Sequence, residues 1–462
     1  MSPEGSQSEQ TARAPAAAPE RWFAIAWAAA LLFHHRFSIP WPDHPAGAAD
    51  LVAVAAAIVT LVRPDLALPL AVLAASQLAG YALSSPVTSN HYTLAAFVNV
   101  AVLLALVARR DPKSAFACYA PVGRGIVVLL YFWSFFHKLN EGFLDPGASC
   151  AVALSDGIAR GLGASAFPLH AGLAIYGTLA IEGLAALLLL TRRGWPIAVL
   201  IVLPFHYAIP FSGFAFYIDF STALLALLTL FIGAERLAAF TSAVWGQRSA
   251  APGSPRLRRL CTGIAVALGF AVASLVSDDR ASEVHLGLFS LYAAPLSVFL
   301  GGCAVQAWRA REPLALPRFG SGAWLAIPLL FFINGASPYL GLRTENAMAM
   351  FSNLRTEGAT ANHLLMGRSA DRTDAQRPVR ILASDLASLA AFAGNPDRGL
   401  AWFEFWRRVG DARGGTIRYE VAGERFEHRV GSDVPRYRPP TWLVPIAVFR
   451  PVELRVPSPC SH

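Results

Sequence analysis

The stretch HYTLAAFVNVAVLLALVAR, residues 91–109, has no charged residue before its final arginine. It is long enough to cross a bilayer as a helix, because about 20 residues at ~1.5 Å each span the ~30 Å hydrocarbon core. Similar apolar runs occur at 21–40, 48–62, 64–84, 120–137, 166–191, 194–213, 216–234, 257–276, 284–307 and 322–340. The sequence therefore predicts an all-α, polytopic membrane bundle of about eleven spans.

The composition of the 462-residue chain agrees with this fold class. Hydrophobic residues make up 55% and charged residues only 15%, against about 25% charged residues in soluble domains. The net charge of +8 is explained by membrane topology, so no nucleic-acid partner is expected. The five cysteines form no Cys-x-x-Cys pair, which argues against a disulfide scaffold or a cysteine zinc site, and no metal site is predicted.

Loop charges predict the orientation. With a cytoplasmic N-terminus, the inner segments carry 17 lysines and arginines and the outer loops carry four. Cytoplasmic loops are enriched in these residues, so we expect an integral protein of the inner or plasma membrane with its C-terminal region outside. The expected domains are a disordered tail (1–20), a transmembrane bundle (21–341) and an extracytoplasmic domain (342–462).

The last domain is expected to be small and of mixed α/β structure. Helices are predicted at 383–392 and 398–410, and two alternating strands within 417–430. A cluster of aromatic residues is either the core of this domain or a contact with the lipid interface; it comprises Trp402, Phe403, Phe405 and Trp406. The polar stretch 351–363 is either a site or a collar that joins the domain to the bundle. Cys150 and Cys460 share the oxidising side, but Cys460 lies near the chain end, so no disulfide between them is expected.

Lysine usage singles out one candidate. Only two of the 38 basic residues are lysines, Lys113 in an inner loop and Lys138 at the outer end of an aromatic helix. Arginine stays protonated near neutral pH, whereas a lysine in dry surroundings can lose its proton. Lys138 is therefore either a general base or a lysine that snorkels to the head groups.

Other polar residues are expected near the same outer side. Ionisable groups inside spans are costly and are therefore informative. Tyr131 shares the helix face of Lys138, and Asp219 is expected to pair with His206. The further candidates, each with an alternative role in helix packing, are His91, Asn99, His137 and Glu182.

These residues carry a resemblance to a known family. The stretch YFWSFFHKLNEGFL (131–144), followed by Pro146 and Ser149-Cys150-Ala151, resembles the signature of the vitamin K-dependent gamma-carboxylase-like membrane family, also called the HTTM domain. Asn90-His91, Glu182 and Phe205-His206 are similar to further family segments. The resemblance covers roughly 21–340 and differs from the carboxylases at His137, where they have lysine, and at Asn140, where they have an acid.

The resemblance implies a lyase-type enzyme with its active site at the outer face. Lys138 would deprotonate reduced vitamin K or a menaquinol-type quinol, O₂ would convert this quinol to an epoxide, and CO₂ would add to a glutamyl side chain. His91 and His206 would be the other catalytic residues, supported by His137, Asn99, Tyr131, Glu182 and Asp219. The expected partners are the lipid bilayer, the membrane quinol and a secreted peptide or protein substrate.

Two other functions remain open at this point. The chain could be a non-enzymatic accessory protein for maturation or export of a secreted peptide, which binds a partner through 342–462. A solute transporter is the third reading, although the sequence has no paired interrupted helices in two matching halves.

Overall fold

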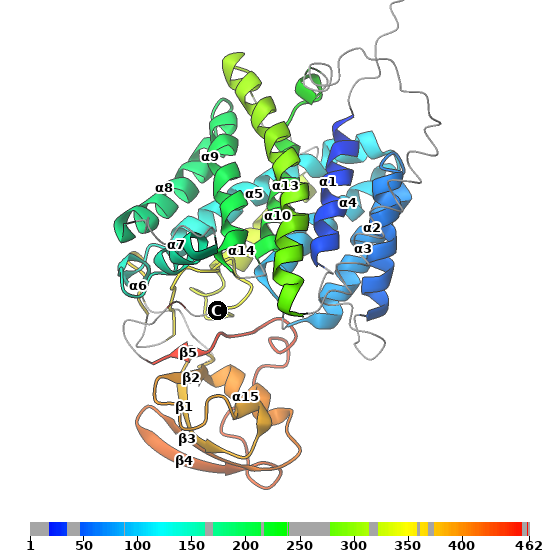
Figure 1. The fold of residues 1–462 in the computed structure, drawn as a ribbon. Helices are drawn as coiled ribbons and strands as arrows, with labels where there is room; N and C mark the ends of the chain where they lie inside the picture. Colours follow the sequence, from blue (N-terminus) through cyan, green and yellow to red (C-terminus); the bar gives the residue numbers. More distant parts are fainter. Residues whose placement is uncertain are drawn as a thin grey trace, which may run out of the picture.

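A computed structural model describes residues 18–34, 47–86, 88–161, 170–213, 217–237, 239, 278–313, 322–357, 361–367, 374–454 and 460. It consists of a helical bundle with a small domain at one end (Figure 1). We call that end of the bundle the C-domain end. The predicted tail 1–20, apart from its last three residues, and the predicted span 257–276 lie outside the described residues.

The helices of the bundle follow the apolar runs. They are α1 (Pro19–His34), α2 (Gly47–Val62), α3 (Ala67–Ser84), α4 (Asn90–Arg109), α5 (Pro112–His137), α6 (Glu141–Leu144), α7 (Cys150–Gly161), α8 (Ala171–Leu189), α9 (Trp195–Ala208), α10 (Tyr217–Leu228), α13 (Asp278–Arg309) and α14 (Ala326–Ala336). Short 3₁₀ segments, Ile209–Ser212, Thr229–Phe231 and Gly322–Leu325, extend α9 and α10 and precede α14.

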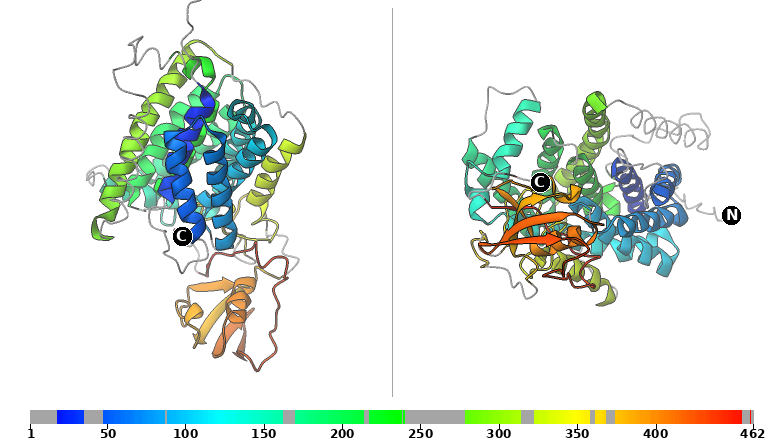
Figure 2. Two further views of the ribbon diagram at one scale, coloured as in Figure 1. Left: turned by 90° about the vertical axis from the view of Figure 1, so that its right-hand side faces the viewer. Right: turned by 90° about the horizontal axis from the view of Figure 1, so that it is seen from below.

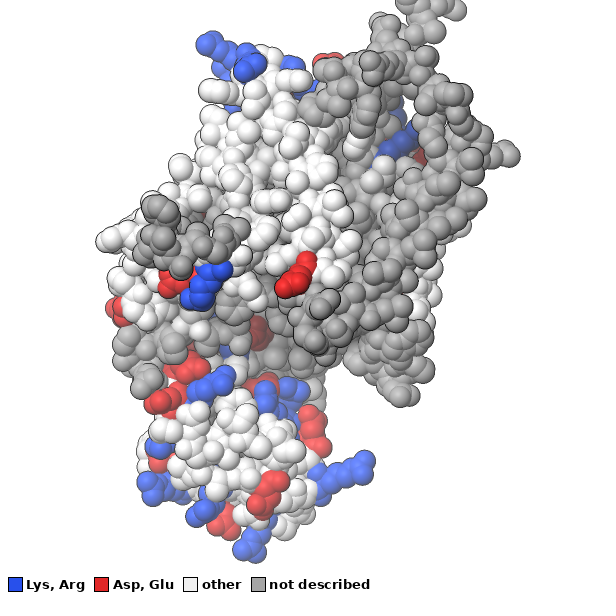
Figure 3. Space-filling view, viewed as in Figure 1, with Lys and Arg blue, Asp and Glu red and all other residues white. Residues whose placement is uncertain are grey.

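Among the described residues, six helices are long and apolar enough to cross a membrane: Ala67–Ser84, Asn90–Arg109, Pro112–His137, Ala171–Leu189, Trp195–Ser212 and Glu283–Arg309. Three apolar helices are shorter, Gly47–Val62, Tyr217–Phe231 and Gly322–Ala336. The chain is thus a helical integral membrane protein, but the predicted count of about eleven spans is not confirmed. Figure 3 shows a largely uncharged flank along the bundle and dense mixed charges on the small domain.

Packing in the bundle joins helices that are distant in the chain. The helix α1 lies against α10, α5 against α8, and α9 against α13. Buried large side chains such as Trp27, Trp195 and Phe289 fill the interior. The short helix α7 approaches the turn after α9 so closely that a Cβ on Gly157 or Gly161 would meet the backbone carbonyls of Ser212 and Phe211. Glycine at these two positions therefore lets α7 lie directly on that turn.

The C-terminal domain is an antiparallel sheet with one helix. Its strands are β1 (Pro378–Ser384), β2 (Arg398–Ala401), β3 (Thr416–Val421), β4 (Glu424–Arg429) and β5 (Val452–Glu453), in the order β4-β3-β1-β2-β5. The helix α15 (Trp402–Gly410) packs against the sheet. The predicted hairpin within 417–430 is confirmed, with Val421 paired to Glu424.

Two helix predictions in this domain need correction. Most of 383–392 is the end of β1 and a 3₁₀ turn, and 398–401 is a strand that precedes α15. Tertiary pairing of β1 with β3 and β2 overrides the local pattern. The aromatic cluster is the core of the domain, since Trp402, Phe403, Phe405 and Trp406 are all at most 5% exposed. Within α15, hydrogen bonds from Arg407 to the buried Glu404 raise the pKa of this arginine.

Residues 344–363 form a collar between the domain and the bundle. Asn90, at the start of α4, accepts a hydrogen bond from the Met348 backbone N–H at 2.7 Å, and the backbone N–H of Cys150 donates to Asn353 at 2.8 Å. Asn346, Met348, Phe351 and Asn353 all have positive φ. Such backbone conformations are costly for non-glycine residues and persist where the surroundings fix them. The collar interpretation of this stretch is therefore correct.

A disulfide adds a second attachment. Cys150, the first residue of α7, is bonded to Cys460. The expectation that these cysteines stay apart is wrong, because the preceding chain is held in place: β5 pairs with β2, and Glu453 forms an ion pair with Arg398 at 3.1 Å. The end of the chain is thereby tied to the C-domain end of the bundle.

Candidate functional site

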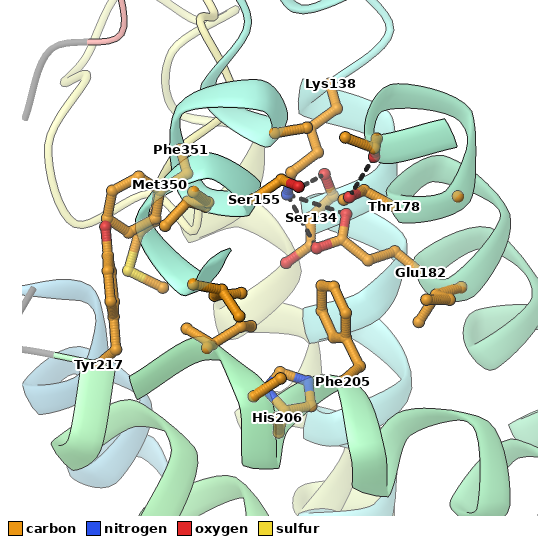
Figure 4. A pocket seen from close by; sticks show the side chains of 18 of the residues that line it. Ser134, Lys138, Ser155, Thr178, Glu182, Phe205, His206, Tyr217, Met350 and Phe351 are labelled. Carbon is orange, nitrogen blue, oxygen red and sulfur yellow. Dashed lines mark hydrogen bonds and ion pairs between the residues drawn. The ribbon is translucent and has the colours of Figure 1, made fainter. Parts of the chain in front are cut away.

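A cavity of about 370 Å³ lies at the C-domain end of the bundle. Its wall comes from α5, α7, α8 and α9, with Met350 and Phe351 of the collar closing one side (Figure 4). Most of the lining is apolar, including Leu130, Phe143 and Ile181. The cavity also reaches Leu173 on α8, which is 60% exposed. Because α8 presents much of its surface to the outside of the bundle, the cavity opens toward the lipid-facing side.

The polar centre of this cavity is a buried ion pair. Lys138 follows the last residue of α5, and its Nζ lies 2.9 Å from Oε1 and 2.8 Å from Oε2 of Glu182 on α8. The same nitrogen donates to the backbone carbonyl of Ser134 at 3.2 Å. Lys138 and Glu182 are only 5% and 7% exposed. Lys138 therefore does not reach out to head groups, and the pair must recover a desolvation cost of several kcal/mol per ion through these contacts.

Several polar groups around the cavity have no hydrogen-bond partner among the described residues. They are the hydroxyls of Tyr131 and Ser155 and both ring nitrogens of His206. The three residues are at most 7% exposed, and the rings of Tyr131 and His206 lie 5.9 Å apart. Buried polar groups nearly always find a partner. Unpartnered ones in the wall of a cavity are the groups that a bound polar ligand would satisfy.

His91 and Asp219 form a separate cluster that does not line the cavity. His91 Nε2 lies 3.7 Å from Oδ2 of Asp219, and the ring of His34 lies 5.1 Å from that of His91. The expected pairing of Asp219 with His206 is therefore wrong. Both residues adjoin the cavity indirectly, because Tyr217 and Phe220, the neighbours of Asp219 on α10, line it.

His137 and Asn99 have structural partners. Nε2 of His137 donates to the Ala347 carbonyl at 3.0 Å, and Nδ1 accepts from the Tyr339 hydroxyl at 2.8 Å. His137 thus ties α5 to the collar. Asn99 accepts a hydrogen bond from the Trp27 indole at 2.9 Å and joins α4 to α1. For both residues the helix-packing alternative describes the contacts.

Next to this site, His363 of the collar has an assigned tautomer. Its Nδ1 accepts from the backbone N–H groups of Leu365 and Met366, so Nε2 carries the proton and donates to the Phe136 carbonyl at 2.8 Å. Burial lowers the pKa of His363, which favours this neutral form. It fixes the collar to the last turn of α5, directly before Lys138.

Of the candidate residues, the structure brings Lys138, Glu182, His206 and Tyr131 together and leaves His91, Asp219, His137 and Asn99 outside the cavity. The sequence reasoning missed Ser155, Thr178 and the collar residues Met350 and Phe351. The pair Gly157 and Gly161 was an available signal for α7, since small residues at this spacing permit close packing.

The fold and the site define a helical membrane protein with a buried ion pair in an otherwise apolar cavity. Comparison with models of protein families, with curated proteins and with solved structures finds no match for this chain.

Proposed function

We propose that the chain is a membrane enzyme of the gamma-carboxylase-like type. It would take reduced vitamin K or a menaquinol-type quinol into the cavity and couple quinol oxygenation to carboxylation, or a related modification, at the C-domain end. The observation that carries the proposal is the Lys138–Glu182 pair in the wall of an apolar cavity.

The cavity residues fit a quinol in three respects. Its apolar lining suits a ring and an isoprenoid tail, and its opening at Leu173 gives the tail a route to lipid. Tyr131, Ser155 and His206 supply unpartnered polar atoms for ring hydroxyls. The quinol would supply two electrons to O₂, giving the epoxide and water, and this oxidation would drive the addition of CO₂ to a glutamyl side chain.

The ion pair can act as the proton acceptor. Lys138 and Glu182 together hold one exchangeable proton and are neutral overall, whether the proton lies on nitrogen or oxygen. If the pair accepts a second proton from a ligand hydroxyl, its positive charge faces the negative charge left on the ligand. Proton transfer then leaves no net charge in the dry cavity, which keeps its electrostatic cost low.

Two observations support an extracytoplasmic position of the site. The Cys150–Cys460 disulfide lies beside the cavity, and such bonds persist in oxidising compartments. The excess of lysine and arginine in the opposite loops supports the same orientation.

A second candidate is a non-enzymatic accessory role in maturation or export of a secreted peptide. It is favoured by one observation, that the C-terminal domain has its own hydrophobic core and a separate cavity. Deleting 342–462 does not separate the two functions cleanly, because the deletion also removes Met350 and Phe351 from the bundle cavity.

Filling the cavity gives a direct test of ligand binding. Gly177 lines it, and a Cβ there meets no atom within 4 Å. Gly177→Phe should therefore fold normally and weaken binding of a radiolabelled menaquinol in nanodiscs by about tenfold or more, because the ring occupies ligand space. Gly287→Phe is the matched control, since Gly287 is equally unobstructed and lies on α13 away from the cavity. Equal quinol affinity of both variants would contradict the assignment of this cavity.

A further inference from the structure

A second cavity, of about 410 Å³, lies in the C-terminal domain. It is enclosed by the end of α15, the end of β4 and the chain that follows β4, which supplies Tyr437 and Arg438. The β3–β4 hairpin is the part of the domain farthest from the bundle (Figure 1), and the domain covers the middle of the bundle when seen from below (Figure 2). This cavity therefore faces away from the membrane.

The deep wall of the cavity offers a hydrogen-bond donor. Trp406 is 3% exposed, and its indole nitrogen has no hydrogen-bond partner among the described residues. His428, 4% exposed, meets the ring of Trp406 edge to face with centroids 4.9 Å apart. A buried indole N–H without a partner is costly and can only donate. It calls for an acceptor from outside the chain.

Two guanidinium groups stand at the rim. Arg413 and Arg438 line the cavity, and neither makes an ion pair or a side-chain hydrogen bond within the part of the chain that the structure describes. The one acidic lining residue, Asp433, already accepts from the Arg429 backbone N–H at 2.6 Å. The C-terminal end of α15 adds about half a negative charge, which two full positive charges outweigh. The rim therefore favours an anion.

The remaining lining is apolar and flat. Tyr437, Pro435, Pro439, Val409 and Val430 surround the donors. A ligand that matches this wall has a carboxylate for the guanidinium groups and an adjoining apolar group for the rings. The free end of a peptide chain has both features, because its terminal carboxylate adjoins its last side chain. Guanidinium groups pair with carboxylates through two parallel hydrogen bonds.

We propose that this cavity binds the C-terminal carboxylate and the last apolar side chain of a peptide. The site is independent of the bundle cavity, and so the inference does not rest on the proposed function. It gives the C-terminal domain a recognition role of its own, whether the bundle is an enzyme or a scaffold.

The test uses the full chain in phosphatidylcholine nanodiscs and a fluorescently labelled peptide that ends in phenylalanine with a free carboxylate. We expect binding by fluorescence anisotropy, and a loss of about tenfold or more in affinity when the peptide is amidated. The double variant Arg413→Gln/Arg438→Gln should lose a similar factor. Arg418→Gln is the matched control, because Arg418 is an exposed arginine on β3 that does not line the cavity.

Further arms separate other ligands and other causes. Trp406→Phe keeps the ring but removes the N–H, and should weaken binding about threefold to tenfold. Lys138→Ala should leave peptide binding unchanged, so failure here is distinct from failure of the bundle site. Equal binding of the amidated peptide would overturn the proposal. So would equal binding of an amidated peptide with an internal glutamate, an equal loss in Arg418→Gln, or binding to phosphatidylserine vesicles but not to the peptide.

Discussion

Quinol turnover should fall by about 100- to 10,000-fold when Lys138 is replaced by arginine, which is the range that a general base contributes. Arginine keeps the positive charge and can still pair with Glu182, so the bundle should fold. A guanidinium group does not release its proton near neutral pH, and the pair then loses its capacity to exchange protons. The measurement is consumption of reduced menaquinone by the purified variant, followed by chromatography.

The chain supplies its own control for this substitution. Lys113, its only other lysine, is exposed in the first turn of α5 at the opposite end of that helix. Lys113→Arg should leave turnover unchanged. Full activity of Lys138→Arg would remove the ion pair from the chemistry.

Replacing Glu182 with leucine should lower the free energy of unfolding by about 3–5 kcal/mol, because it leaves the buried Lys138 ammonium without its counter-charge. The double variant Lys138→Met/Glu182→Leu removes both charges. It should recover most of this loss, since an apolar pair of similar volume is often as stable as a buried ion pair. Both variants should lack quinol turnover.

Thermal and denaturant unfolding in detergent measure these differences. Glu235→Leu is the matched control, because Glu235 is exposed and makes no ion pair among the described residues; its effect should stay within about 0.5 kcal/mol. A Glu182→Leu variant as stable as the unchanged protein would show that the pair is not a buried, coupled unit.

Much of the fold could be predicted from local sequence. Apolar runs such as 91–109 give the membrane helices, because length and hydropathy are local properties. The β3–β4 hairpin follows from alternation around Gly423, which has a positive φ. The strands β1 and β2 were missed, since their pairing depends on residues distant in the chain.

The site was only partly predictable for a similar reason. Lys138 was recognisable because it is a lysine in a chain that otherwise uses arginine. Its partner Glu182 is 44 positions away, and sequence spacing does not say which helices are neighbours. The same ignorance produced the wrong partner for Asp219. The Cys150–Cys460 bond was missed because β5, which holds the end of the chain, gives no local signal in two residues.

The central claim is that the Lys138–Glu182 cavity oxidises a quinol and uses that oxidation to modify a glutamyl side chain. The most direct measurement is mass spectrometry of membranes that contain the protein and reduced vitamin K or menaquinol, compared with membranes that contain the Lys138→Ala variant. We predict quinone epoxide and γ-carboxyglutamate with the unchanged protein and neither product with the variant. Absence of the epoxide from both membranes, or equal amounts in both, would contradict the account.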